Sequence, residues 1–486
     1  MSDFELKELE DGTLEIVKLL TDKEKRVVIP SDIDGKTVSG IGPFAFYMRS
    51  AMNYVIIPNT IKYIESCAFS GCTRINVIYF TGTIQEWCKI KGLGSLMGET
   101  NFAIYGSKGI HTKSLIINNK MIEGNLVIPR DVEIIGNSAF SGVEDITSVT
   151  IPNTVKEIGT SAFAQSPHIT NVIMEDGDEP LRLHSQVFAN CFNLKRVQLS
   201  NRLKRMGGYC FYGCNDIETN KYDNGIYIGS KDNPYFMLLK ICDYKSKYQI
   251  HEECRIIGSK ASFNNSKQEE LYIPKNVVSI GDYAFEGSQI EKIFINVDAK
   301  LEIINDYAFA NMPKLKEFKL PKNVKYIGLD AFCRSQKIKE MILPHGLEKL
   351  GGFAFFECFD IKKLFVPSTL KSFPKTAIYG CKGLEYITFE DGFKVSGFDK
   401  NIFEWFPNIK SIETGKKISR NMALAILYYG IQHRNGSMIQ EKYLDCVYRT
   451  DFDELVTLAR KYDFVTALQS IIVKYNERNG ESKLRL

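Results

Sequence analysis

Apolar positions return along most of the chain in one pattern, close to V-x-I-P-x-x-V-x-x-I-G-x-x-A-F-x-x-C-x-x-L. The aromatic position fixes the period, because Phe140 and Phe163 are 23 residues apart, as are Phe332 and Phe355. One unit has too few apolar residues to enclose a core, so each unit must stack on neighbours that present the same residues at the same height. The pattern therefore predicts a repeat solenoid.

Each unit also predicts its own local structure. Residues 146–151 alternate like a half-buried strand, and Pro152 ends the run because it lacks a backbone donor. Residues 155–158 are typical of a second short extended segment, Gly159 of a turn, and Ser161–Phe163 of a tight helical turn that points the Phe inward. The predicted fold class is a repeat solenoid of parallel β-strands with short helical turns, α+β overall.

The period is interrupted twice, near 82–125 and near 218–255. We interpret both stretches as degenerate coils that carry hairpins, because Asn118-Asn119 and Asp223-Asn224-Gly225 are hairpin-type turn residues. A smaller irregularity occurs at Ser262, which stands where the motif expects Phe and predicts a distorted coil.

The chain divides into three segments on this pattern: an N-terminal capping segment at 1–24, the solenoid at 25–415 and a small all-α module at 416–486. In the module, Ser419 is a predicted N-cap, and Thr450 with Asp453 resembles a capping arrangement for a later helix. We expect the module to cap the last coil, because an uncovered end exposes apolar surface and unpaired strand edges. A second protein-docking site is the alternative.

The repeated I-P…I-G-x-x-A-F-x-x-C pattern, together with the stretch YFTGTIQEWC at 79–88, closely resembles the BspA-like leucine-rich-repeat proteins of bacteria. The resemblance covers roughly residues 25 to 412. It implies a curved, right-handed leucine-rich-repeat solenoid and a role in protein binding or surface adhesion. The family motif contains no catalytic residues, so the resemblance transfers none.

Charge and hydropathy exclude several kinds of partner. Lys and Arg number 62 against 58 Asp and Glu, a net charge of +4, which predicts no binding to nucleic acid. No stretch approaches the roughly 20 apolar residues that span a bilayer, and the N-terminal sequence MSDFELKELEDG has no signal-peptide pattern. We expect a cytoplasmic monomer without membrane insertion, or a surface or secreted protein if the native N-terminus was trimmed.

The 12 cysteines could suggest disulfides or zinc until their register is compared with the repeat. Cys191, Cys214 and Cys358 each stand three residues after the motif aromatic, a position at which other units have Val143 or Ser166. They are therefore predicted to pack in the core. The six histidines are scattered and form no ligand pair. The sequence predicts no metal, cofactor or catalytic site.

The outward side of the strands is the candidate binding face. Residues alternate inward and outward along a strand, so the outward columns follow from the repeat register. The columns carry many apolar side chains, and the predicted partner-binding residues are Tyr54, Ile56, Tyr79, Ile173, Arg196, Tyr272, Phe294, Ile342, Phe365 and Tyr386. Cross-strand packing alone would also favour such residues, whereas exposed aromatic and Arg side chains on a solenoid are typical of an interface.

We therefore expect a non-enzymatic interaction scaffold that binds a protein or peptide on this face. One alternative is a surface adhesin that recognises host protein or glycan. A less favoured alternative is an enzyme whose active site lies in the two irregular stretches.

Overall fold

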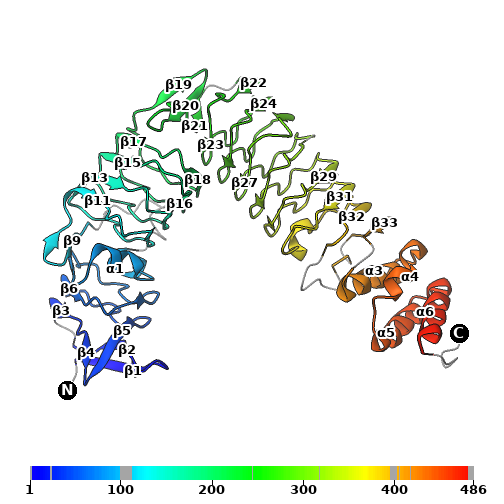
Figure 1. The fold of residues 1–486 in the computed structure, drawn as a ribbon, viewed down its shortest axis with the longest axis horizontal. Coiled ribbons are helices and arrows are strands. Elements are labelled where there is room, and N and C mark those ends of the chain that lie inside the picture. The colour runs from blue at the N-terminus through cyan, green and yellow to red at the C-terminus, as the bar shows by residue number, and fades with distance from the viewer. Residues whose placement is uncertain are drawn as a thin grey trace. The chain divides into compact units, whose positions relative to one another are not determined.

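The computed structural model describes residues 3–21, 24–98, 112–242, 245–316, 318–393, 402–403, 406–415 and 418–479. Parts of the predicted N-terminal segment, of both irregular stretches and of the helical module lie outside these residues, as does His111. The chain forms two compact units of stacked coils (Figure 1). Unit 1 is Met1–Asn220 with Tyr227–Phe236, and unit 2 is Lys221–Ile226 with Met237–Leu486.

Four sheets make up most of unit 1. The first has the order β1-β2-β5-β4, with β7 also paired to β5, and the second has the order β10-β9-β8-β6-β3. Their strands are β1 (Phe4–Glu8), β2 (Leu14–Leu19), β3 (Arg26–Val28), β4 (Asp32–Ile33), β5 (Lys36–Ile41), β6 (Tyr54–Ile57), β7 (Tyr63–Ile64), β8 (Val77–Phe80), β9 (Ser114–Ile117) and β10 (Lys120–Met121). The other two sheets are parallel: β11 (Gly124–Val127), β13 (Ile146–Ile151), β15 (Asn171–Met174), β17 (Arg196–Gln198); and β12 (Ile134–Ile135), β14 (Glu157–Ile158), β16 (Leu181–Leu183), β18 (Leu203–Met206).

In unit 2, long and short strands again form separate layers. The chain passes between the units through β19 (Asn220–Tyr222) and β20 (Gly225–Ile228). The short-strand layer contains β21 (Met237–Ile241), β23 (Ile256–Ile257), β25 (Ser279–Ile280), β27 (Ile303–Ile304), β28 (Tyr326–Ile327) and β30 (Lys349–Leu350). The outward-facing strands are β22 (Lys247–Gln249), β24 (Glu270–Ile273), β26 (Lys292–Ile295), and β29 (Glu340–Ile342), β31 (Lys363–Val366), β32 (Tyr386–Phe389), β33 (Ser411–Glu413).

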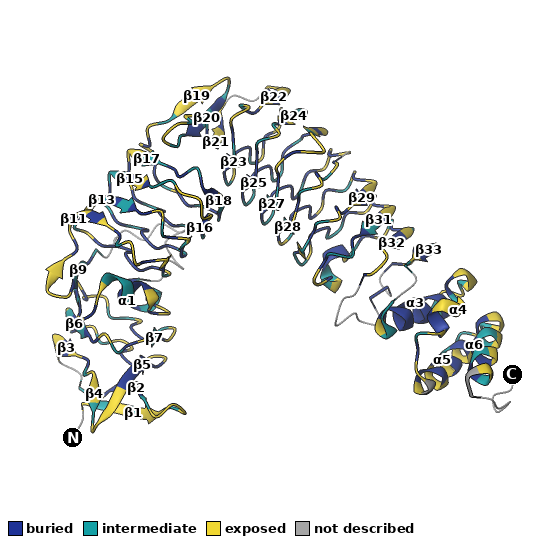
Figure 2. Cartoon of the chain, viewed as in Figure 1, coloured by how far each residue is buried: buried dark blue, intermediate teal, exposed yellow. Residues whose placement is uncertain are grey.

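The predicted repeat is confirmed by the core. The motif Phe rings stack on one another inside each unit, with centroids 5.3 Å apart for Phe140 and Phe163 and 5.5 Å for Phe332 and Phe355. All four rings are fully buried, and Figure 2 shows the same contrast between buried coil interiors and exposed outer surfaces. Because a stacked ring buries its faces against the coils before and after it, the hydrophobic effect stabilises the stack rather than any single unit.

The predicted helical turn at Ser161–Phe163 is wrong in its geometry. Ser161 and Gln165 have φ of 57° and 59°, and the segment is a non-helical turn. The N–H groups of Ser161, Phe163 and Gln165 donate to carbonyls of the next coil at 2.8–3.0 Å. The two left-handed residues aim alternate N–H groups at the neighbouring coil, whereas a helical turn would point them along its own axis. Short helices do occur at α1 (Ile84–Lys89), α2 (Gly94–Met97) and η2 (Lys375–Ile378).

The distorted coil predicted at Ser262 is also wrong. The N–H of Ser262 donates to Ala284 O at 2.7 Å, in the same ladder that other coils use. In place of the missing ring, the Ser262 hydroxyl donates to Gln268 Oε1 at 2.9 Å and accepts from Asn265 Nδ2 at 3.1 Å. All three side chains are buried. Neighbouring coils hold the backbone in place, so the change of residue is absorbed by a polar cluster rather than by the chain path.

The hairpin predictions are confirmed. β9 and β10 pair antiparallel around Asn118 and Asn119, which have φ of 48° and 62°. β19 and β20 are hydrogen-bonded neighbours on either side of Asp223 and Asn224. Positive φ at the loop residues matches the right-handed twist of the strands.

The cysteines in the motif register form a ladder of hydrogen bonds. The thiol of Cys191 donates to Phe163 O at 3.1 Å, and Ser335, at the same register, donates to Phe309 O at 2.7 Å. Each acceptor is the carbonyl of the motif Phe in the preceding coil; the same bond is made by Cys72, Ser166, Cys214, Cys358 and Cys381. Burial raises the pKa of these thiols, that of Cys381 to about 12, so they stay protonated donors.

This ladder predicts which substitutions Cys191 tolerates. Cys191→Ser keeps a donor toward Phe163 O and should leave stability nearly unchanged, whereas Cys191→Ala leaves that buried carbonyl unpaired at a cost of about 1–3 kcal/mol. Thermal unfolding followed by circular dichroism compares the two variants. Equal losses would show that the volume of the sulfur matters and the hydrogen bond does not.

The C-terminal module is helical, as predicted, with α3 (Arg420–Gln432), η3 (Gly436–Met438), α4 (Glu441–Leu444), α5 (Arg449–Lys461) and α6 (Val465–Asn479). Ser419 is the N-cap of α3 and accepts a hydrogen bond from Met422 N. The predicted cap at Thr450 and Asp453 is wrong by register, because Asp451 accepts from the N–H of Tyr448 at the start of α5.

Lys113 places a buried amine within the first irregular stretch. The residue is 6% exposed, and its Nζ donates to Met97 O at 2.9 Å. Burial lowers the pKa of Lys113 from 10.5 to about 8. The unfolded chain therefore binds more protons than the folded chain between these two values, and stability should rise with pH across that window.

Replacing this amine with an apolar side chain should remove the effect. Lys113→Met is expected to be more stable than the wild type by about 1–3 kcal/mol at pH 7, because the folded chain no longer holds a charge in the interior. The difference should shrink as the pH approaches 10.5, the ordinary value for Lys. Urea unfolding at several pH values measures it, with exposed Lys120→Met as the control. A constant difference across pH would contradict the assignment.

Candidate binding face

The ten predicted residues lie in four groups, one in each of four sheets. The groups are Tyr54 and Ile56 on β6 with Tyr79 on β8; Ile173 on β15 with Arg196 on β17; Tyr272 on β24 with Phe294 on β26; and Ile342, Phe365 and Tyr386 on β29, β31 and β32. The strand register sets Ile56 beside Tyr79, Tyr272 beside Phe294 and Ile342 beside Phe365. Neighbouring strands therefore bring the outward residues together, although the first two groups belong to unit 1 and the others to unit 2.

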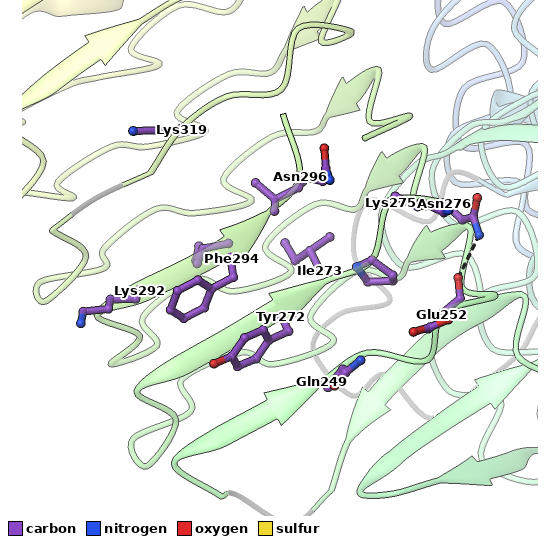
Figure 3. A pocket seen from close by; sticks show the side chains of 13 residues that line it. Gln249, Glu252, Tyr272, Ile273, Lys275, Asn276, Lys292, Phe294, Asn296 and Lys319 are labelled. Atoms are coloured by element: carbon purple, nitrogen blue, oxygen red, sulfur yellow. Dashed lines mark hydrogen bonds between the residues drawn. The ribbon is translucent and has the colours of Figure 1, made fainter. Parts of the chain in front are cut away.

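A hollow of about 730 Å³ surrounds the aromatic pair of unit 2 (Figure 3). The rings of Tyr272 and Phe294 stack with centroids 4.6 Å apart, and they are 36% and 42% exposed. The Tyr272 hydroxyl donates to Glu270 at 3.1 Å, and Glu270 in turn pairs with Lys247 at 3.1 Å. That ammonium lowers the pKa of Glu270, so the carboxylate stays charged and holds the phenol.

Polar and basic side chains also line this hollow, beside the apolar Ile273, Pro274, Ile293 and Ile295. Gln249 and Asn296 are exposed beside the rings, and Lys275, Lys292 and Lys319 add three ammonium groups. Figure 3 shows Lys292 and Lys319 beyond Phe294, and Gln249 beyond Tyr272. The arrangement is an apolar floor with polar groups around it, which is the usual anatomy of a protein-binding site.

A second, smaller hollow of about 280 Å³ lies on the same face of unit 2. Ile342, Phe365 and Tyr386 line it together with Thr388, and Ile342 is 59% exposed. Five of the ten predicted residues therefore gather at two hollows of one unit.

The predicted residues of unit 1 are less available than the sequence suggests. Tyr54, Ile56 and Tyr79 are only half-buried rather than fully outward, and so is Phe365 in unit 2. The Tyr79 hydroxyl donates to Asn119 in the β9–β10 hairpin, and the guanidinium of Arg26 lies 5.1 Å from the centre of the Tyr54 ring. The hairpin and the neighbouring strand thus cover part of this group.

The second group of unit 1 is also partly engaged. Ile173 is 43% exposed, but the Arg196 guanidinium pairs with Glu218 at 3.2 Å. Because both charged side chains of this pair are exposed, it contributes little to stability, and Arg196 can exchange Glu218 for another carboxylate.

Two residues of the same columns were missed. Val28 on β3 and Val127 on β11 are 53% and 54% exposed, and they pair with Ile56 and Thr150 in neighbouring strands. Each stands directly before the apolar-Pro step of its unit. The register rule that selected Ile56 selects them too once it is applied to their coils.

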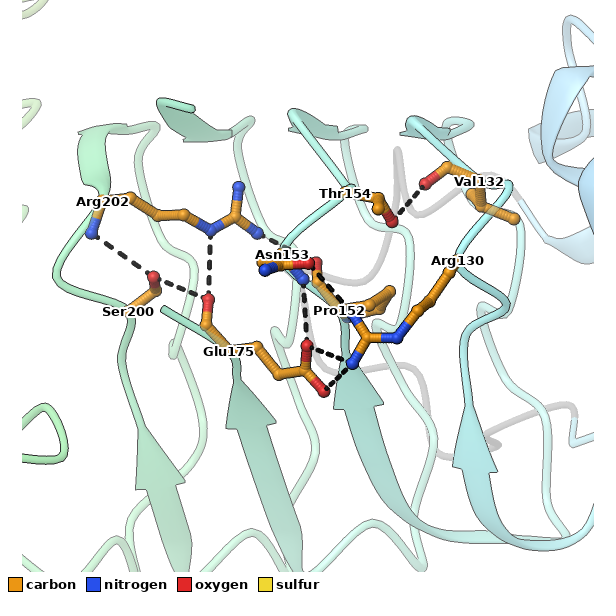
Figure 4. A network of polar contacts seen from close by, with 8 residues as sticks. All are labelled: Arg130, Val132, Pro152, Asn153, Thr154, Glu175, Ser200 and Arg202. Carbon is orange, nitrogen blue, oxygen red and sulfur yellow. Dashed lines mark hydrogen bonds and ion pairs between the residues drawn. The ribbon is translucent and has the colours of Figure 1, made fainter. Parts of the chain in front are cut away.

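At the carboxyl ends of the strands, hydrogen bonds between polar groups join coils that are two repeats apart, and we call each such set a polar bracket. The Arg130 guanidinium donates to both oxygens of Glu175, at 3.1 and 2.9 Å, and the N–H of Asn153 in the coil between donates to the same carboxylate (Figure 4). Unit 2 repeats the arrangement, with His345 and the N–H of Ser368 on Glu390. The brackets fix one border of the face.

The electrostatics of the second bracket favour a charged carboxylate. Burial acts to raise the pKa of Glu390, but hydrogen bonds from Ser368 and His345 outweigh it and leave the pKa below its usual value. A Glu takes the place of the motif Pro in both brackets, so the free N–H of the preceding coil finds an acceptor there.

The irregular stretch at 218–255 contributes a polar hollow of about 550 Å³ in unit 1. Its ionisable lining residues are Glu218, Lys231 and Asp232, and Glu218 already pairs with Arg196. An enzyme would need an acid, base or nucleophile at this position whose surroundings prepare it for reaction. The contacts of Glu218 instead resemble an ordinary surface pair.

Within the described part of the chain, no group of three His, Cys, Asp or Glu side chains could hold a metal ion. None of the helices there has the length and apolar composition of a membrane span.

Comparison of the sequence with known protein families identifies the type of repeat in this solenoid. The pattern of the BspA type leucine rich repeat region matches in six copies, over residues 32–89, 118–232, 238–335 and 302–422. The chain belongs to this family. BspA-type leucine-rich-repeat proteins typically mediate protein interactions or surface adhesion and are usually non-enzymatic. No curated protein matches the chain.

Solved structures that are similar to this chain include several leucine-rich-repeat proteins of bacteria. A leucine rich cell surface protein from Faecalibacterium prausnitzii is 19% identical over 84% of this chain and 96% of its own, with a TM-score of 0.33. A leucine-rich repeat protein from Bacteroides ovatus is 21% identical over 85% and 98%, with a TM-score of 0.33. The pneumococcal vaccine antigen PcpA is 19% identical over 85% and 97%, with a TM-score of 0.34.

Proposed function

We propose that this chain is a non-catalytic interaction scaffold that holds a protein or peptide partner on the outward strand face, with the two hollows of unit 2 as the centre of the site. The main support for this proposal is that apolar side chains of the strand face line concave surface. Tyr272 and Phe294 line one hollow, and Ile342, Phe365 and Tyr386 line the other. Exposed apolar residues in a concave, polar-rimmed surface favour binding, because a partner that buries them gains the hydrophobic effect.

Family membership supports the same kind of function, since BspA-type proteins act through binding. The cross-strand packing of Tyr272 and Phe294 would by itself explain their residue types. It does not account for hollows in which both rings remain more than a third exposed.

The experiment is quantitative affinity capture from lysate of the source cells, with the immobilised chain in three forms. The forms are the wild type, the double variant Phe294→Glu/Phe365→Glu, and Val473→Glu, which places the same charge at a residue of α6 that is 56% exposed. Circular dichroism establishes that each variant is folded. We expect one protein to be captured by the wild type and by Val473→Glu and to be lost with the double variant.

The other outcomes separate the alternatives. Equal capture by all three forms would contradict the strand face as the site. Loss only with Val473→Glu would place docking on the helical module. A wild type that captures no protein but retains a surface glycan would favour the adhesin alternative over an intracellular partner.

A further inference from the structure

The lysines around the larger hollow differ from most of those that border the coils. Elsewhere in unit 2, a lysine commonly pairs with a carboxylate of the neighbouring coil, as Lys247 does with Glu270 at 3.1 Å and Lys316 with Glu291 at 2.8 Å. Lys275, Lys292 and Lys319 make no ion pair with a residue in the described ranges. Among the described residues, the hollow therefore carries positive charge that no coil-to-coil ion pair uses.

Two carboxylates on which Lys292 acts already have other lysine partners. Lys292 acts electrostatically on Glu270 and Glu291, but Lys247 and Lys316 hold those two groups. Glu252 is the one acidic residue among those that line the hollow. Complementary charge is consequently expected from a partner.

Lys319 has a particular place in the column of apolar residues. Along the coils of unit 2 this column reads Tyr272, Phe294, Lys319, Ile342 and Phe365. The N–H groups of Lys316 and Lys322 donate to Glu291 O and Val297 O, both at 3.2 Å, so the coil of Lys319 stacks directly on that of Phe294. Lys319 is an exposed cation at the border of the larger hollow, and it stands between Phe294 and Ile342 in this column.

The spacing of the hollows matches an extended peptide that crosses the strands. Stacked strands lie about 4.8 Å apart, so the centres of the two hollows, three strands apart, are separated by about 14 Å, with Lys319 halfway. In an extended peptide, residues i, i+2 and i+4 point to the same side and span about 13 Å. One side of such a peptide can reach both hollows and the lysine together.

We infer that the partner segment is an extended acidic peptide of the form apolar-x-(Asp or Glu)-x-apolar, whose two apolar side chains enter the hollows at Tyr272/Phe294 and Ile342/Phe365 while the central carboxylate pairs with Lys319. This inference rests on the proposed function and specifies the chemistry of its partner. The aliphatic and aromatic side chains of the hollows favour apolar residues at the two outer positions of the peptide, and the Lys319 cation favours an acidic residue at the middle position.

The test begins with selection from a random linear peptide library displayed on phage, against the full-length wild type, Lys319→Glu and Phe294→Glu/Phe365→Glu. The wild type should enrich the apolar-x-acid-x-apolar pattern, and Lys319→Glu should enrich the same pattern with Lys or Arg in the middle. The double variant should enrich neither. Lys300→Glu, an exposed lysine outside the lining of the hollow, is the matched charge control and should select as the wild type does.

Fluorescence anisotropy with synthetic peptides of the selected sequence then gives the magnitude. Replacing the central acid by Lys should weaken binding to the wild type by about tenfold or more, and Lys319→Glu should reverse that preference. Moving the acid by one position should also weaken binding, because the side chain then points away from Lys319.

The outcomes that overturn the inference differ from those that overturn the proposed function. Enriched peptides that require Phe294 and Phe365 but not Lys319 would reject the acidic centre and keep the binding face. Peptides bound equally well by Phe294→Glu/Phe365→Glu would reject the face itself. A wild type that enriches no linear peptide, or that binds heparin or RNA in competition with every selected peptide regardless of its apolar residues, would reject an acidic peptide as the ligand.

Discussion

Arg202→Met is expected to destabilise unit 1 by about 3–5 kcal/mol, because the variant removes four hydrogen bonds from a charged donor, including the one that reaches the buried Val155 carbonyl. Arg202 is 5% exposed. Its guanidinium donates to the carbonyls of Pro152 and Glu175 at 3.0 and 3.1 Å (Figure 4). It also donates to those of Val155 and Glu179 at 2.6 and 3.3 Å. One side chain therefore ties together three successive coils.

The charge of this guanidinium is tolerated for a physical reason. Burial lowers the pKa of Arg202, but Asp176 and Glu175 act against that shift, and an arginine remains protonated at any pH at which the protein is folded. The four acceptors replace the water that burial removes.

The measurement is hydrogen exchange followed by mass spectrometry, because unfolding of stacked coils need not be a single two-state step. In Arg202→Met the amides of 153–155 and 175–179 should exchange faster than in the wild type, while unit 2 should be unchanged. The control is Arg182→Met on the adjacent β16, where the residue is exposed and the substitution should cost less than about 0.5 kcal/mol. Similar exchange in both variants would contradict the role of Arg202.

Arg202 also illustrates which features the sequence could predict. The repeat, the strands and the buried Phe column follow from residue type at a fixed spacing, since Phe163 and Phe188 each occupy the same interior position of their coils. Arg202 stands at a position where the repeat motif does not specify a charged residue. Its contacts lie 23 to 50 residues away in the chain, so they depend on how the coils stack and not on any local pattern.

The backbone of the turns was unpredictable for a related reason. Ser161 and Gln165 both adopt positive φ, which costs an ordinary residue about 1–2 kcal/mol. The ladder of hydrogen bonds to the next coil offsets this cost. The residue types in this turn do not indicate that its backbone adopts positive φ. Other coils do place Gly at the second position, as at Gly213 and Gly287, and comparison of these coils is the signal that could have revealed the turn.

For the candidate site, the alternation of outward residues was enough to select Tyr272, Phe294 and Ile342, all of which are exposed. It could not show that Tyr79 lies against the β9–β10 hairpin or that Arg196 holds Glu218, because both contacts come from irregular stretches. Nor could it show that two hollows of unit 2 lie at Tyr272 and Phe294 and at Ile342, Phe365 and Tyr386. The alternation of side chains along a strand predicts which residues point outward, whereas the concave shape of the surface around them depends on the surrounding loops.

The second large effect is expected at the edge of the last strand. β33 ends its sheet, yet the helical module donates to the carbonyl of Ile412 in this strand and to those of the residues on either side of it. Tyr443 donates to Ile412 O at 3.0 Å, Asn435 and Ser437 donate to Lys410 O, and Lys442 donates to Thr414 O. The Tyr429 hydroxyl donates to Phe406 O and accepts from Ile409 N. These bonds support the capping role over a separate docking role for the module.

Tyr429→Phe/Tyr443→Phe should therefore weaken docking of the helices by about 2–4 kcal/mol. Both rings are buried, the Tyr443 hydroxyl is the donor to Ile412 O in the edge strand, and the Tyr429 hydroxyl bonds to Phe406 O and Ile409 N just before that strand. Amides of 409–413 and of α3 should exchange faster, and the mass measured by light scattering should rise with concentration, because an uncovered edge strand can pair with a second chain. Tyr462→Phe, a half-buried ring of the same module, controls for loss of a phenol hydroxyl.

A double variant that stays docked and monomeric would show that apolar contacts suffice to cap the solenoid. A double variant that stays docked but fails to bind the captured partner would instead assign the module to docking.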